Sequence, residues 1–66
     1  MKTDNLKRCI VRAATECEEC LRLADFAERE PSLSGGMADS LRKMAAYHSD
    51  NAFLWARRLH AVESHA

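Results

Sequence analysis

The chain has 66 residues, of which 47% are hydrophobic and 30% are charged, and its ten basic and ten acidic side chains cancel at neutral pH. A chain of this length forms at most one small domain, whose core supplies only about 3–5 kcal/mol, so disulfides, a metal or oligomerisation usually add stability. The absence of a net charge also means that no overall field favours nucleic acid or a membrane surface.

The N-terminal residues and the cysteines indicate where the protein works. The sequence contains no run of about 18 uncharged apolar residues, which a transmembrane helix needs, and residues 1–8 lack the apolar segment of a signal peptide. Cys9, Cys17 and Cys20 are an odd number of cysteines, all in the first half, so we expect reduced thiols rather than an intramolecular disulfide framework. We therefore expect a cytoplasmic protein that does not bind membranes.

The first half of the chain predicts one long helix over about residues 4–30. Thr3 or Asp4 can cap its first backbone N–H groups, and Pro31 cannot continue its hydrogen-bond ladder. Small and apolar residues recur four and three positions apart along one face of this helix. These residues are Leu6, Ile10, Ala13, Cys17, Cys20, Ala24 and Ala27.

Residues 31–36 hold the only proline and the only glycines of the chain, and they predict a tight turn. A second helix is expected over about residues 36–63, with Ser34 as its N-cap. Its stripe has the same alternating spacing, which is typical of coiled-coil-like packing. The residues of this stripe are Ala38, Leu41, Ala45, His48, Ala52, Trp55, Leu59 and Val62.

The predicted fold class is all-α, with residues 1–66 forming a single antiparallel two-helix hairpin. With the turn near residue 33, residues whose numbers sum to about 66 should face each other, which places Cys17 near His48. Two helices cannot enclose a core, so we expect the hairpin to dimerise into a four-helix bundle. The expected dimer core consists of Leu6, Ile10, Ala13, Cys17, Leu41, His48, Ala52, Trp55 and Leu59.

Apolar side chains outside the stripes and the distribution of charge point to a protein partner. The hairpin brings residues 1–12 beside residues 55–66, and this open end holds six basic and two acidic side chains, whereas residues 13–54 hold four basic and eight acidic ones. Aromatic residues and arginine dominate protein interfaces. We therefore predict a non-enzymatic adaptor, regulator or inhibitor that binds itself and another protein. The partner-binding residues are expected to be Tyr47, Phe53, Leu54, Arg8, Arg12, Arg57 and Arg58.

Two alternatives remain at this point. Cys17 and Cys20 share a helix face opposite His48, so two thiolates and one imidazole could bind zinc or another soft metal; otherwise the cysteines are small core residues. The basic open end could bind nucleic acid, although the chain has no recognition motif for it. No catalytic motif is recognisable, and no cofactor is expected.

Overall fold

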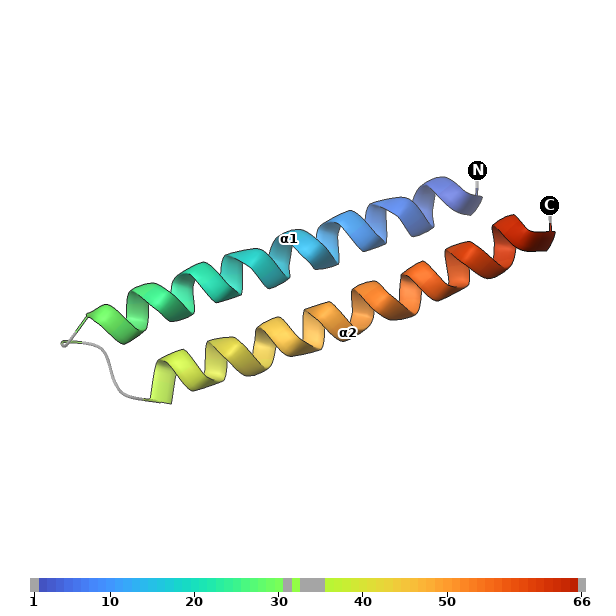
Figure 1. Ribbon diagram of the computed structural model, residues 1–66. Helices are drawn as coiled ribbons and strands as arrows, with labels where there is room; N and C mark the ends of the chain where they lie inside the picture. The colour runs from blue at the N-terminus through green and yellow to red at the C-terminus, as the bar shows by residue number, and fades with distance from the viewer. Residues whose placement is uncertain (1, 31, 33–35, 66) are drawn as a thin grey trace.

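The computed structural model describes residues 2–30, 32 and 36–65. Helix α1 spans Lys2–Arg29 and helix α2 spans Gly36–His65. Among the described residues, only Glu30 and Ser32 lie outside these two helices. The two helices lie side by side and run in opposite directions, with both termini at the same end (Figure 1). The predicted all-α hairpin is therefore confirmed.

The helix boundaries agree with the predicted ones to within two residues. The backbone N–H of Glu30 donates to the carbonyl of Phe26 over 3.1 Å and so completes the last turn of α1. Asp4 and Asp39 lie in the first turns of the two helices, where a carboxylate stabilises the positive end of the helix dipole. The predicted helix stop at Pro31 and the predicted N-cap at Ser34 lie outside the described residues.

The core between the helices consists of small side chains. Among the described residues, the buried ones are Ala13, Cys20, Ala24, Ala27, Ala38 and Ala45. These positions belong to the two predicted stripes, and their short side chains let the helix backbones approach closely. The other predicted dimer-core residues, from Leu6 in α1 to Leu59 in α2, are only half-buried. The hairpin therefore has a thin core, and none of its described large side chains is fully buried.

The molecule is elongated, with extents of 53 × 14 × 11 Å and a Cα radius of gyration of 15.3 Å. A compact domain of the same length would have a radius of gyration of about 11 Å. In the part of the chain that the structure describes, neither helix carries an apolar stretch that could span a membrane. The long, narrow shape leaves a large share of each helix without a neighbour.

Two contacts between the helices define their register. His48 Nδ1 lies 3.2 Å from Glu16 Oε2, and Arg42 Nη2 lies 2.6 Å from Glu28 Oε2. The residue numbers in these pairs sum to 64 and 70, on either side of the predicted 66. The register is therefore close to the predicted one.

Candidate functional site

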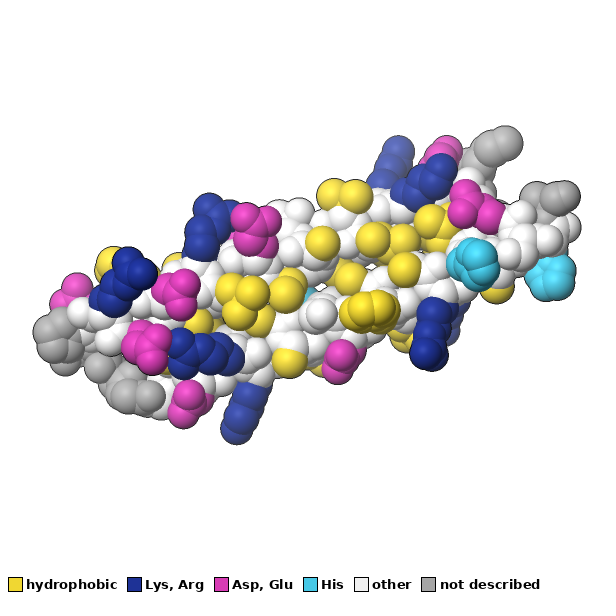
Figure 2. Space-filling view, viewed as in Figure 1, with side chains coloured by type: hydrophobic (Ala, Val, Ile, Leu, Met, Phe, Trp, Pro, Cys, Tyr) yellow, Lys and Arg dark blue, Asp and Glu magenta, His cyan; other side chains and the backbone are white. Residues whose placement is uncertain are grey.

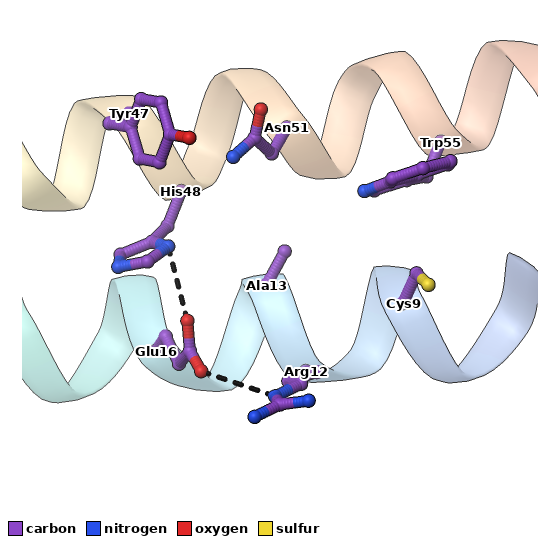
Figure 3. Close-up of a pocket in the computed structure, with 8 residues that line it drawn as sticks. All are labelled: Cys9, Arg12, Ala13, Glu16, Tyr47, His48, Asn51 and Trp55. Carbon is purple, nitrogen blue, oxygen red and sulfur yellow. Dashed lines mark hydrogen bonds and ion pairs between the residues drawn. The ribbon is translucent and has the colours of Figure 1, made fainter.

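The candidate site is a groove of about 190 Å³ between the two helices in the middle of the hairpin. Four side chains from each helix line it, and Figure 3 shows Ala13 between a polar group at one end and Trp55 at the other. The lining residues are Cys9, Arg12, Ala13, Glu16, Tyr47, His48, Asn51 and Trp55. The groove thus combines an imidazole, a carboxylate, a guanidinium, an amide and an indole.

The polar end of the groove is organised around Glu16. One oxygen of its carboxylate faces His48 Nδ1 at 3.2 Å, and the other accepts a hydrogen bond from Arg12 Nε over 3.4 Å (Figure 3). The His48 side chain is only 20% exposed, and its ring and that of Tyr47 form a T-shaped pair with a centroid separation of 5.6 Å. The carboxylate therefore bridges the two helices and positions the imidazole toward α1.

The metal site predicted from the sequence is not formed within one hairpin. Cys20 is buried and Cys17 is half-buried, and both are free thiols. In the described part of the chain, no three His, Cys, Asp or Glu side chains are grouped closely enough to bind a metal ion. Glu16, the polar partner of His48 Nδ1 at 3.2 Å, comes from the helix turn next to Cys17.

Phe53, Leu54 and Arg57, all predicted to contact a partner, lie together on α2. Together with Asp50 they line a shallow hollow of about 280 Å³ on the surface of α2, where the four residues lie on successive helical turns. Phe53 is 71% exposed, the highest value among the large apolar side chains described. This hollow therefore offers two apolar side chains to a partner, flanked by one acidic and one basic side chain.

The remaining predicted partner residues are distributed elsewhere. Tyr47 and Arg12 line the groove between the helices, and the guanidinium of Arg58 lies over the ring of Trp55, 4.9 Å from its centroid. Arg8 is exposed on α1 near the open end. The predicted set is therefore divided between at least two surfaces and does not form one patch.

A further hollow, of about 390 Å³, lies on α1 and was not predicted as a site. It is lined by Glu19, Arg22, Leu23 and Phe26, with Leu23 54% and Phe26 60% exposed. These residues are spaced three, four and seven positions apart, as on one face of a helix. From the sequence, this spacing could have indicated a shared helix face. Two of the four residues are charged, however, so they do not form an apolar stripe.

Comparison of the chain with protein-family models, curated proteins and solved structures found no match. The functional interpretation therefore depends on the arrangement of the side chains.

Proposed function

We propose that the protein is a non-enzymatic interaction module that forms a four-helix bundle from two hairpins and docks onto another protein as an adaptor, regulator or inhibitor. One observation carries this proposal. Among the described residues, ten large apolar side chains are 40–71% exposed, whereas no large side chain is fully buried. A single hairpin therefore exposes the residues that normally form a core.

The free energy available from covering these side chains is large. Complete burial of a Val, Leu, Met or Phe side chain is worth about 1.5–3 kcal/mol, and the exposed set includes all four types. Clustered apolar side chains on a soluble protein mark sites of association. Self-association into a bundle covers part of this surface, and the rest is available to a second protein.

The second protein is proposed to bind the outer surface of α2 and the basic open end. Tyr47, Phe53 and Leu54 supply exposed aromatic and aliphatic anchors. The open end supplies arginines on both helices, among them Arg8 and Arg57. This combination of aromatic and arginine side chains is the one most often found at the centre of protein interfaces.

The three cysteines support the predicted cytoplasmic location. Cys9, Cys17 and Cys20 are all free, and reduced thiols are typical of proteins in a reducing compartment. A fluorescent fusion, labelled at the turn or at either terminus, would test this location in the host cell.

Self-association is tested by measuring thermal unfolding across a hundredfold range of protein concentration, together with sedimentation. If folding is coupled to association, the unfolding midpoint rises with concentration and the mass is that of two chains. A monomeric mass with a constant midpoint would contradict the proposal.

Docking onto another protein is tested by comparing the recovery of bound proteins with Tyr47→Ala/Leu54→Ala and with the wild type. The double variant is expected to lose the bound partner. Glu19→Ala is the control, because Glu19 is exposed on α1, away from the outer surface of α2 and from the open end. Equal recovery with a folded double variant would show that these side chains are not the docking surface.

A further inference from the structure

The seam between the two helices has two different sides. The groove of Figure 3, with Glu16 and Asn51, opens on one side. The ion pair between Glu28 and Arg42 also joins the helices, but these residues belong to other rows of the helical repeat. Residues seven apart lie on the same face, so Ala14 and Leu21 follow the row of Glu28. Residues 49 and 56 follow the row of Arg42 on α2.

The side marked by the Glu28–Arg42 pair is apolar over its middle. We name it the apolar face, and its exposed members are Val11, Ala14, Glu18 and Leu21 of α1 with Ala46, Phe53 and Ala56 of α2. Half-buried Ser49 lies in the same row of α2 as Ala56. Among these eight positions of the apolar face, Glu18 is the only charged residue. The opposite side carries Arg12, Glu16 and His48 over the same length. Figure 2 shows hydrophobic side chains gathered along the seam between the helices, with charged side chains mainly at the edges and toward the ends.

The surface area of the hairpin matches what a dimer would need to bury. One hairpin of 7.5 kDa exposes 5270 Å², whereas a compact monomer of this mass exposes about 4,200 Å². Two separate hairpins expose about 10,500 Å², and a compact protein of twice the mass exposes about 7,000 Å². The difference of about 3,500 Å² lies within the range of about 2,000–5,000 Å² for obligate homodimers.

A two-fold axis parallel to the helices would place α1 of one copy over α2 of the second copy. Symmetry then imposes the register of the hairpin itself, whose two ion pairs have residue numbers that sum to 64 and 70. At the middle of this range, Val11 faces Ala56, Ala14 faces Phe53, and Leu21 faces Ala46 of the second copy. Each pair combines a large with a small side chain, as interdigitated packing requires.

The charges on this face are mixed in the same arrangement. At the turn end, Asp25 would face Arg42 of the second copy, a pair of opposite charge, whereas at the open end the same rows place Asp4 opposite Glu63. The arginines that make the open end basic lie largely elsewhere, since Arg12 lines the groove and Arg58 stacks on Trp55. The like ends of two copies can therefore meet without placing these arginines against each other.

We propose that the occupant of the apolar face is a second copy of this chain, packed about a two-fold axis parallel to the helices with both turns at the same end. This inference rests on the proposed self-association and identifies the face and the register. Phe53 is then a residue of the dimer interface, and Tyr47 and Leu54 remain for a different protein.

The first test compares Leu21→Glu with Leu23→Glu by sedimentation over a range of concentrations. The two leucines are similarly exposed, at 47% and 54%, but only Leu21 belongs to the apolar face. Leu21→Glu is expected to raise the dimer dissociation constant at least about tenfold, which corresponds to one unpaired charge in an interface. Leu23→Glu is expected to leave it near the wild-type value. Equal effects of the two variants, or a larger effect of Leu23→Glu, would overturn the proposed face.

The second test concerns the register. Leu21→Ala leaves two small residues opposite each other in a homodimer, and Ala46→Leu places two leucines against each other, so each variant alone dimerises more weakly. Mixing the two chains restores one large and one small residue at both positions, and native mass spectrometry should show the heterodimer in excess over either homodimer. Because this rescue occurs between chains, contacts within one hairpin cannot produce it. A statistical mixture of the three dimers would overturn the register.

The two proposals fail in different ways. A wild-type chain that stays monomeric in sedimentation would contradict self-association and this inference together. A stable wild-type dimer that Leu21→Glu does not weaken would leave the proposed function intact and reject the apolar face as its interface.

Discussion

His48 Nδ1 lies 3.2 Å from Glu16 Oε2, so a carboxylate of α1 positions the half-buried imidazole of α2. The same carboxylate accepts a hydrogen bond from Arg12, which makes Glu16 the centre of a three-residue polar cluster. In a hairpin whose core consists of alanine and cysteine side chains, this cluster contributes specificity to the register. A shift of one helical turn would leave His48 without its partner.

Glu16→Ala should destabilise the hairpin by about 1 kcal/mol, because it leaves a half-buried imidazole without its polar partner. Urea unfolding followed by circular dichroism measures the change. Glu19→Ala is the matched control, since Glu19 is exposed on α1 and lies outside the apolar face. A loss of stability as large for Glu19→Ala would show that the contact between the helices contributes nothing.

Ala24→Leu should destabilise the protein by about 1–3 kcal/mol. Ala24 is fully buried where the helices approach, so a larger side chain must separate them or adopt a strained rotamer. Ala61→Leu makes the same substitution at an exposed position of α2 and should have little effect. Thermal unfolding of the two variants distinguishes these outcomes, and equal midpoints would place the close approach of the helices elsewhere.

The pair between Arg42 and Glu28 should make stability depend on salt. The hydrogen bond to Glu28, followed by the charge of that carboxylate, raises the pKa of Arg42 above its ordinary value. When folding raises the pKa of a basic group, the resulting stabilisation is fully present below the ordinary pKa of that group. This stabilisation is lost only as the pH rises through the pKa of the folded state. The contribution of Arg42 is therefore fully present at neutral pH, where salt rather than pH weakens it.

Arg42→Gln is accordingly expected to lower the thermal midpoint at low salt and to have less effect at about 1 M salt, where the Debye length is about 3 Å. Glu28→Arg/Arg42→Glu, which exchanges the two charges, should recover part of the loss. Arg22→Gln removes an exposed pair within α1 and is the control. An effect of Arg42→Gln that is independent of salt would mean that the side chain acts through packing.

Cobalt(II), used as a spectroscopic probe for zinc, should give no thiolate-to-metal absorption band at stoichiometric concentration. The reason is that, among the described residues, no three His, Cys, Asp or Glu side chains are grouped closely enough to bind a metal ion. A chelator should likewise leave the unfolding midpoint unchanged. If a band appears and Cys17→Ser abolishes it, the ligands must be assembled differently from the arrangement in one hairpin, and the metal alternative becomes the better hypothesis.

The periodicity of the sequence predicts the helices and their inner faces well. A stripe such as Ala13, Cys20 and Ala24 appears in the sequence as a spacing of three and four, and the structure buries all three residues. The partner of His48 could not be predicted in the same way. The predicted register places Cys17 opposite it, but an adjacent residue, Glu16, reaches across with its longer side chain.

The exposed surfaces were harder to predict because their rows combine different side-chain types. On α1, Ala14 and Leu21 share a row with charged Glu28, so the row has no simple apolar pattern. On α2, Phe53 and Leu54 are adjacent in sequence, and only the position of the second helix decides which side of the molecule each one serves. A helical wheel of one helix does not contain this information.

The buried alanines and cysteine all lie between Ala13 and Ala45 in the sequence, so burial does not extend to the open end. The last three turns of each helix at the open end have half-buried or exposed side chains only, among the residues described. Amide protons near both termini should therefore exchange with solvent much faster than those around Ala24 and Ala45. The hairpin would then behave as a rigid stem with a fraying basic end, and a partner that binds this end would order two helix termini at once.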